Sequence, residues 1–443
     1  MKVLFITDDY IIDPLGIGWL SAYLKQAGHD VDIHKLVGKT NPILEHEPDM
    51  VCYSVTTGRH GYYRDMNLAL KNSGGNFVSV FGGPHVTFFP EFAKEEGVDI
   101  AVRGEGFDAI VDIANALETG DDISTIPNVV GNNLRPSKDK ATLLPPDREL
   151  IYGFPKNRDN PIKNVMASFF CPFSCSYCYN PRHKEMYGIH RSEIRPMERV
   201  AEEIEQLREY PLGLIFFNDD IFPLYDHKWL DDFCFYYSGV GLPFHIQLRV
   251  EYIKDDAIRR LKEVGLHGVT FAIESGNARL REEILERHFS NDRVEKAAAI
   301  VHKYGIKLRT ENMVGVPGET WETAMQTLSL NTACQPEIAW ASLYQPYPGT
   351  KLGDRCVTDG LFNGDLDSMS ESFFDTYKLN VSEGKKFERL QKLFSFMAKY
   401  PRLRAFLPLL VRLPFRYGWF YSKVKARLYK QLYKVAKDET ATV

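Results

Sequence analysis

The amino-acid sequence predicts an α/β protein with three parts: a doubly wound, Rossmann-like domain, a partial (β/α)6 barrel, and a mostly helical C-terminal region. Apolar strand-like runs alternate with amphipathic helical stretches twice along the chain, and six strand–helix units follow the second start. The length of 443 residues also suggests two or three domains. We expect the first domain at 1–125, a linker at 126–161, the barrel at 162–352 and the helical region at 353–443.

The first third of the chain carries the alternation that predicts the doubly wound sheet. Gly18–Ala27 is amphipathic and is closed by Gly28, a helix C-terminal signal. Short connections between such helices and apolar strands are typical of a parallel sheet. Residues 126–161 are rich in Pro and Asn, which indicates a linker that runs along the surface. The expected strands are 3–7, 31–36, 50–55, 77–81 and 100–102.

A second alternation starts at Asn164–Ser168 and predicts the barrel. Six units are too few to close an eight-stranded barrel, so the expected product is open. The further expected strands are 214–218, 244–248, 268–273, 306–312 and 338–344. The expected helices are 197–208, 228–237, 255–264, 293–303 and 320–330.

The composition is that of an ordinary globular protein, with 44% hydrophobic and 26% charged residues. No run of eighteen uncharged apolar residues is present, and the first seven residues have the pattern of a strand rather than of a signal peptide. Seven cysteines are too few for a disulfide framework in a chain of this length. The sequence therefore predicts a cytoplasmic protein.

The net charge of −5 hides a basic C-terminal region, where fifteen Lys/Arg face three Asp/Glu from Lys385 onward. Aromatic residues are mixed with these cations, and residues 423–430 have the pattern of an amphipathic helix. Such a segment can lie peripherally on an anionic membrane, or it can be a helical cap over the barrel with its cations in solvent. Nucleic-acid binding is not expected, because no recognised binding module accompanies the charge.

Three of the seven cysteines, Cys171, Cys175 and Cys178, lie within eight residues, directly after the first barrel strand. The C-terminal ends of barrel strands are where active sites are built. Three thiolates can hold three irons of a four-iron, four-sulfur cluster and leave the fourth iron open to another ligand.

Two other interpretations of the cysteines remain open. A zinc site usually takes four Cys or His ligands, and His183 is the nearby candidate for a fourth. Alternatively, the three cysteines are unligated core residues. Cys52, Cys234, Cys334 and Cys356 are expected to be buried small hydrophobes.

The spacing Cys-x-x-x-Cys-x-x-Cys after the first strand of a partial barrel resembles the radical S-adenosylmethionine (SAM) superfamily over about residues 164–352. The resemblance implies a [4Fe–4S] cluster whose open iron chelates SAM, one-electron cleavage of SAM to a 5′-deoxyadenosyl radical, and an external reductant of the flavodoxin or ferredoxin type. It implies an adenine contact for Tyr177. Further SAM contacts are implied for Asn218, Asp219, Asp220, Arg249, Glu274, Ser275, Asn312 and Gly315, which all follow or end predicted strands.

A doubly wound domain ahead of such a barrel resembles the cobalamin-binding subgroup of the family. Its modules carry Asp-x-His-x-x-Gly, then Ser-x-Leu, then Gly-Gly, and the matching positions here are Asp13, Leu15, Gly18, Ser54, Thr56, Gly82, Gly83 and His85. Leu15 stands where the family has the cobalt-ligating His. The lower axial ligand is therefore expected to be absent or supplied otherwise, with His60 and His85 as possible substitutes, and a vestigial domain is the alternative.

If both cofactors bind, the resemblance implies methylation of an unactivated carbon of an unknown small-molecule or lipid-like substrate, with two SAM consumed per product. A second possibility keeps the radical step but gives a cyclase, an oxidase or a carbon–carbon coupling enzyme. A third is an iron–sulfur electron carrier or sensor. The set of residues at the strand ends argues against the third, because a carrier needs no SAM pocket.

Overall fold

The computed structural model describes residues 1–8, 12–36, 41–370, 372–413 and 416–434. These residues form two compact units. The first contains residues 1–164, 209–211 and 366–370, and the second contains the remaining described residues. The segment predicted as a linker therefore lies within the first unit, while the predicted domain boundaries themselves stay predictions.

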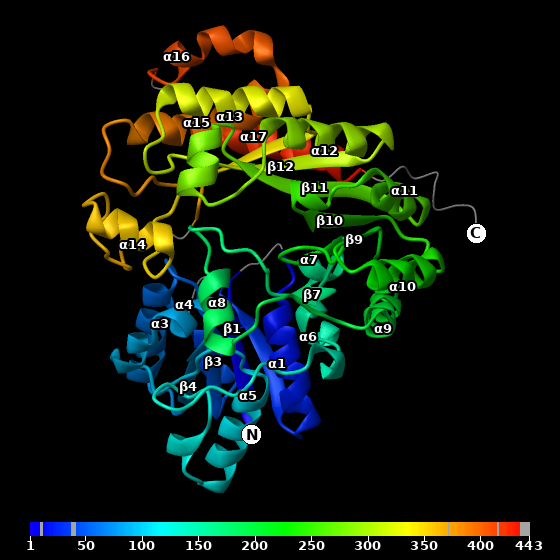
Figure 1. Ribbon diagram of the computed structural model, residues 1–443. Coiled ribbons are helices and arrows are strands. Elements are labelled where there is room, and N and C mark those ends of the chain that lie inside the picture. The colour runs from blue at the N-terminus through cyan, green and yellow to red at the C-terminus, as the bar shows by residue number, and fades with distance from the viewer. Residues whose placement is uncertain (9–11, 37–40, 371, 414–415, 435–443) are drawn as a thin grey trace. The chain divides into compact units, whose positions relative to one another are not determined.

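The first unit is built on a parallel sheet of five strands in the order β2-β1-β3-β4-β5 (Figure 1). This order, in which the chain starts in the middle and winds to both edges, confirms the doubly wound fold. Each strand begins and ends within two residues of the predicted run. Their bounds are β1 Lys2–Thr7, β2 Asp30–Lys35, β3 Met50–Ser54, β4 Val78–Gly82 and β5 Ile100–Ala101.

Helices cover both faces of this sheet and give it two apolar cores. On one face α1 (Leu15–Gln26) and α5 (Phe107–Thr119) bury side chains such as Leu24 and Ile113. On the other face α3 (His60–Asn72) buries Leu70 against the strands. Burial on both faces explains why the inner strands β1, β3 and β4 are mainly apolar, while the edge strand β2 alternates polar and apolar residues. Two short helices, α2 (Asn41–Glu45) and α4 (Pro84–Phe88), complete the alternation.

The last part of the predicted linker is not a surface segment. It forms α6 (Arg148–Tyr152) and α7 (Pro155–Arg158), and the side chains of Ile151 and Tyr152 are buried. A Cβ on Gly18 of α1 would come within 2.7 Å of Ile151 Cδ1, so α1 and α6 pack closely at this point. The Pro-rich composition was therefore a guide to turns but not to exposure.

The second unit is built on a six-stranded sheet whose strands follow the order of the chain, β13-β12-β11-β10-β9-β6. The pairs from β9 to β13 are parallel, which confirms the partial (β/α)6 barrel. Its strands are β6 Ile162–Val165, β9 Leu214–Phe217, β10 Phe244–Leu248, β11 Leu266–Glu274, β12 Lys307–Val314 and β13 Ile338–Leu343. The connecting helices are α9 Met197–Leu207, α10 His227–Ser238, α11 Asp255–Glu263, α12 Asn291–Lys303 and α13 Trp321–Cys334.

The predicted first barrel strand, Asn164–Ser168, is wrong as a single strand. The parallel strand stops at Val165, and β7 (Ser168–Phe169) pairs instead with β8 (Glu193–Ile194) in an antiparallel ribbon. The carboxylate of Asp219 accepts hydrogen bonds from the backbone N–H groups of Ala167 and Ser168. Because these donors are taken, the ladder cannot continue, and the chain leaves the sheet just before the cysteines.

The described part of the C-terminal region is helical, as predicted. It contains α14 (Lys351–Thr358), α15 (Gly384–Lys399), α16 (Leu407–Leu410) and α17 (Tyr417–Leu432). Within the second unit α15 and α17 pack on β13 and on each other. Residues 435–443 of the predicted region lie outside the described residues. Within the part of the chain that the structure describes, we find no helix with the length and apolarity needed to cross a membrane.

Candidate functional site

The three predicted cysteines lie between β7 and α8 (Asn180–Tyr187) and line a single cavity of about 200 Å³ in the second unit. The other walls come from the C-terminal parts of the barrel strands and the loops that follow them. Among the residues predicted for SAM, the cavity is lined by Tyr177, Asp220, Arg249 and Glu274.

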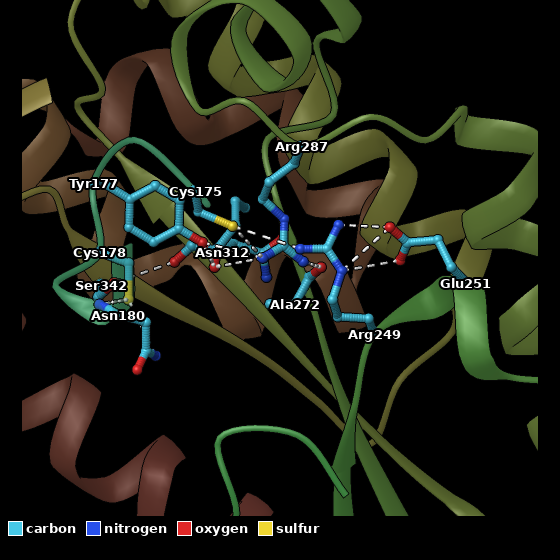
Figure 2. Close-up of polar contacts among 11 residues, drawn as sticks. Cys175, Tyr177, Cys178, Asn180, Arg249, Glu251, Ala272, Arg287, Asn312 and Ser342 are labelled. Atoms are coloured by element: carbon cyan, nitrogen blue, oxygen red, sulfur yellow. Dashed lines mark hydrogen bonds and ion pairs between the residues drawn. The ribbon is translucent and has the colours of Figure 1, made fainter. Parts of the chain in front are cut away.

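Nitrogen donors surround the cysteine sulfurs. Arg249 Nη1 lies 3.5 Å and Arg287 Nη1 3.9 Å from Cys175 Sγ, and the backbone N of Asn180 lies 3.4 Å from Cys178 Sγ. Figure 2 shows the two guanidinium groups converging on Cys175 from different elements. N–H groups directed at sulfur stabilise thiolates and help to set the potential of an iron–sulfur cluster. The donor set therefore fits an anionic cluster held by three thiolates.

Glu274 and Arg287 form a charged pair beside the sulfurs. Tyr177 Oη donates a 2.8 Å hydrogen bond to Glu274 Oε1, while Arg287 Nη1 lies 3.9 Å from the same oxygen. Arg287 also donates to Tyr177 Oη and, through Nη2, to the carbonyl of Ala272 at 2.8 Å. Burial raises the pKa of Glu274, and the charge of Arg287 opposes this shift. The pair offers both a cation and an anion to an amino acid such as the methionine end of SAM.

The backbone is strained at three positions that border the site. Phe170, Glu274 and Glu286 have φ of 63°, 62° and 54°, although none is glycine. Each such conformation costs about 1–3 kcal/mol, so it persists only where the surroundings fix it. Phe170 precedes Cys171 and Glu286 precedes Arg287, so the strain lies next to the groups that converge on the cavity.

The other residues predicted for SAM lie outside the lining of this cavity; they are Asn218, Asp219, Ser275, Asn312 and Gly315. Asp219 Oδ1 holds the segment before the cysteines, accepting from the backbone N of Ala167 at 3.0 Å and from Ser168 Oγ at 2.7 Å. Burial raises the pKa of Asp219 to about 7, and the bonds from Ser168 oppose this shift. Its structural role is therefore to position the cysteine loop.

Asn312 and Gly315 also have structural partners. Asn312 Nδ2 donates a 2.7 Å hydrogen bond to the carbonyl of Trp340, and its Oδ1 accepts one from Asn331. Gly315 has φ of 82°, and a Cβ there would collide with the ring of Tyr377, whose hydroxyl donates to the Gly315 carbonyl at 2.7 Å. Both residues hold the strand end and its turn in place.

Sequence reasoning missed several residues that line the cavity. They are Asn180, Gln247, Leu248, Thr270, Phe271, Ala272, Arg287 and Glu311. Gln247 and Glu311 lie on predicted strands, and the period-2 alternation of a strand would have identified them as facing the barrel interior. Arg287 follows a short π-helical segment, 280–284, and no local pattern indicates where its side chain points.

His183, the candidate fourth zinc ligand, packs its ring against Phe170 and Tyr187. Across the described residues, no group of three or more His, Cys, Asp or Glu side chains is arranged to hold a single metal ion. In a cubane cluster each thiolate binds a different iron, so its ligands need not converge on one point.

In the first unit, the predicted cobalamin residues of β3 and β4 lie together at the strand ends. Ser54 pairs with Gly82 in register, and the side chains of Ser54 and Thr56 are exposed. Gly83 has φ of 94°, and a Cβ there would lie 2.8 Å from the backbone N of Val55. Glycine at position 83 therefore lets the loop after β4 pack against the backbone after β3. The exposed side chains of Ser54 and Thr56 stand at the C-terminal edge of the sheet, where doubly wound sheets bind ligands.

The predicted Asp13-x-Leu15-x-x-Gly18 segment is buried by the end of the supposed linker. Asp13 Oδ2 accepts a 2.7 Å hydrogen bond from Tyr152 Oη and forms an ion pair with Arg148 at 3.4 Å. Leu15 begins α1 and is 5% exposed. Through these two contacts the carboxylate of Asp13 holds α6 in place.

The two histidines considered as substitute ligands are also buried. The rings of His60 and His85 stack with centroids 3.8 Å apart, and both side chains are at most 3% exposed. His85 Nδ1 lies 3.0 Å from Thr57 Oγ1, and His60 Nε2 lies 3.0 Å from Asp367. Burial lowers the pKa of His85 to about 3, so the ring is neutral. Their contacts are those of residues that stabilise the strand ends.

Comparison with known protein families agrees with this geometry. Residues 165–330 match the radical SAM superfamily, and residues 1–114 match the B12 binding domain. The chain therefore belongs to the radical SAM superfamily, in the subgroup with an N-terminal cobalamin-binding domain. Members of this subgroup use a [4Fe–4S] cluster, SAM and cobalamin.

Individual relatives include an uncharacterized methyltransferase of Pyrococcus horikoshii, which is 28% identical over 79% of this chain and 79% of its own length. The anaerobic magnesium-protoporphyrin IX monomethyl ester cyclase of Rubrivivax gelatinosus is 26% identical over 80% of this chain and 70% of its own. The solved structure of the cobalamin-dependent SAM radical enzyme OxsB is similar in fold, with a TM-score of 0.69 and 15% identity over 98% of this chain and 72% of that protein.

Proposed function

We propose that this protein is a radical SAM enzyme that reductively cleaves SAM and, with cobalamin, methylates an unactivated carbon of a substrate still to be identified. The observation that carries the proposal is the cavity lined by three cysteines, Glu274 and two arginines, in a chain that also has a B12-binding domain. A carrier of electrons needs no such charged pocket.

In this proposal Cys171, Cys175 and Cys178 hold the cluster, and Glu274 and Arg287 hold the amino-acid end of SAM. When bound, the cluster supplies the electron that splits the sulfonium, and cobalamin supplies the methyl group. Arg249 and Arg287 stabilise negative charge at the sulfurs through their N–H groups. The carboxylate of Glu251 holds Arg249 in place by accepting hydrogen bonds from Nε and Nη2, so the donor is oriented before any ligand arrives.

For cobalamin we propose Ser54, Thr56, Gly82 and Gly83 as the backbone edge that approaches the cofactor. The supporting observation is that the small side chains of Ser54 and Thr56 are exposed at the C-terminal edge of the sheet, where Ser54 pairs with Gly82. Leu15 offers no metal-binding atom, and the rings of His60 and His85 are stacked in the interior. We therefore propose a cobalt without a histidine ligand from this domain.

Leu15→His is expected to leave the absorption spectrum of the bound corrinoid unchanged. The side chain at this position is only 5% exposed at the start of α1, so an imidazole there would be enclosed by protein rather than open to a ligand. The variant should also unfold at a lower temperature, because burying an imidazole nitrogen without a hydrogen-bond partner is unfavourable. Leu15→Met is the volume-matched control. A new spectrum typical of histidine-ligated corrinoid would contradict the assignment.

Two molecules of SAM should be consumed for each methylated product. One is cleaved to 5′-deoxyadenosine and the other restores the methyl group on cobalamin, so 5′-deoxyadenosine and S-adenosylhomocysteine should appear in about equal amounts. Mass spectrometry of cell extracts incubated with the enzyme and methyl-labelled SAM measures both and identifies the product. Abundant 5′-deoxyadenosine without S-adenosylhomocysteine or a labelled product would contradict methylation.

Abundant 5′-deoxyadenosine without a labelled product would support the second candidate. This candidate is a radical SAM cyclase, oxidase or carbon–carbon coupling enzyme in which cobalamin does not deliver methyl. The observation in its favour is the similarity to the magnesium-protoporphyrin IX monomethyl ester cyclase. Both candidates share the cluster and the SAM pocket, so the labelled methyl group alone separates them.

We also propose a reductant and a location for the protein. The reductant would be a small flavodoxin- or ferredoxin-type protein, since one-electron cleavage of SAM needs an external donor. The protein would work in the cytoplasm, with a peripheral position at a membrane through its basic C-terminal region.

A further inference from the structure

A group of large apolar side chains lies exposed on the C-terminal part of the second unit. They come from the 3₁₀ helix 401–406, the following helix α16, the residues just after α16, and the first turn of α17. The members of this C-terminal apolar surface are Leu403, Phe406, Leu409, Leu413 and Trp419, which are 39%, 58%, 58%, 43% and 59% exposed. Figure 1 shows α16 at the periphery of its unit, beyond α15. Contiguous exposed apolar groups usually mark an interaction surface.

The segment that carries this surface is fixed to the rest of the second unit by buried side chains and hydrogen bonds. Leu407 and Val411 are buried, and Arg389 Nη1 donates a 2.7 Å hydrogen bond to the carbonyl of Val411. Arg404 Nη2 donates to the carbonyl of Leu328 at 2.8 Å, and Tyr417 Oη donates to that of Leu413 at 2.8 Å. The inward-facing residues thus fix the backbone, and the apolar residues between them face outward. The surface is preformed and does not have to fold on binding.

The charge of the segment that carries the surface is of one sign. Residues 389–434 contain twelve Lys or Arg and no Asp or Glu. Several of these cations are exposed, and within the described part of the chain their side chains make no ion pair or hydrogen bond. They are Arg402, Arg412, Arg416, Lys423 and Arg427. Cations without partners, interleaved with large apolar groups, match the boundary between lipid headgroups and acyl chains.

We infer that the C-terminal apolar surface binds an anionic lipid bilayer, with its apolar side chains entering the interface and its arginines at the lipid phosphates. Charge complementarity favours this partner, because a stretch of 46 residues without one carboxylate suits a surface that is negative everywhere. Trp419 and Phe406 are aromatic, and aromatic side chains, Trp above all, are common at the membrane–water interface. The inference goes beyond the proposed methylation and does not depend on it.

The test is flotation of the full-length holoenzyme with vesicles of phosphatidylcholine alone or with about one third phosphatidylglycerol. Wild-type protein should float with the anionic vesicles at least about tenfold better than with neutral ones, and added salt should weaken binding. Equal binding to both vesicle types, or no binding to either, would overturn the inference.

Paired surface variants separate the apolar from the charged contribution. Phe406→Ser with Leu409→Ser should lower binding at least about tenfold, while Phe235→Ser, which removes a 76% exposed ring on α10, should not. Arg412→Glu with Arg416→Glu should also lower binding to anionic vesicles at least about tenfold. Lys228→Glu with Lys262→Glu reverses the same number of charges on α10 and α11 and should not lower it.

These positions are exposed, so the variants should keep wild-type iron content and SAM cleavage. Loss of either would reveal misfolding rather than lost binding. A concentration-dependent dimer that disappears in Phe406→Ser/Leu409→Ser would instead assign the surface to a second copy of the chain and overturn the bilayer.

Discussion

Replacing Cys175 by alanine is expected to abolish SAM cleavage, by at least about a thousandfold, in protein reconstituted with iron and sulfide under anaerobic conditions. Cys175 is buried, and its sulfur receives N–H groups from Arg249 and Arg287. Without it, two thiolates remain for a cluster that needs three. Iron content, the visible absorbance of the cluster and the yield of 5′-deoxyadenosine measure the loss together.

Cys234→Ala provides the control for this experiment. Cys234 is half-buried on α10, in the same unit but outside the cavity lining. Its replacement should leave iron content and SAM cleavage near wild type. Retention of a full cluster in Cys175→Ala, or an equal loss of iron in Cys234→Ala, would contradict the assignment of the cluster ligands.

Glu203→Ala is expected to produce the largest loss of stability, about 3–5 kcal/mol. Glu203 forms a 2.8 Å ion pair with Arg195, and both side chains are at most 1% exposed. Removing the carboxylate leaves a guanidinium charge in the interior without its counter-ion. Arg195 also donates to the carbonyl of Met166 at 2.6 Å, so the damage should extend to the segment that precedes the cysteines. Urea unfolding of the cofactor-free protein measures the change in free energy.

The adjacent residue on α9 is a matched control. Glu202 forms an ion pair with Arg199 at 3.0 Å, but both side chains are more than half exposed. Solvent screens such a pair, so Glu202→Ala should change the stability by no more than about 1 kcal/mol. Similar losses in the two variants would mean that burial of the Arg195–Glu203 pair is not what makes it important.

The fold could be predicted because both sheets are parallel and covered by helices. Buried strands are mainly apolar runs, and the strand Phe244–Leu248 has the bounds that the sequence predicts. The failure at Asn164–Ser168 has a long-range cause: the carboxylate of Asp219, far along the chain, captures two backbone donors. No local pattern carries that information.

The part of the candidate site that lies in one short stretch of sequence could be predicted. The cysteines and Tyr177 stand in one short loop, so spacing alone indicated them, and the cavity includes all four. Asn312 and Gly315 were chosen for their place at a strand end, but their partners Trp340 and Tyr377 make them structural. Arg287 was missed because its direction is set by tertiary contacts.

The last described helix of the second unit has a consequence for how the protein folds. Tyr433, just after α17, packs against His245 and Phe216, and the Leu432 carbonyl lies 2.8 Å from His267 Nε2. These contacts join β9, β10 and β11 to residues synthesised much later, so they close very long loops. The barrel should therefore fold slowly, because its strands gain these contacts only after the chain has been synthesised through residue 433.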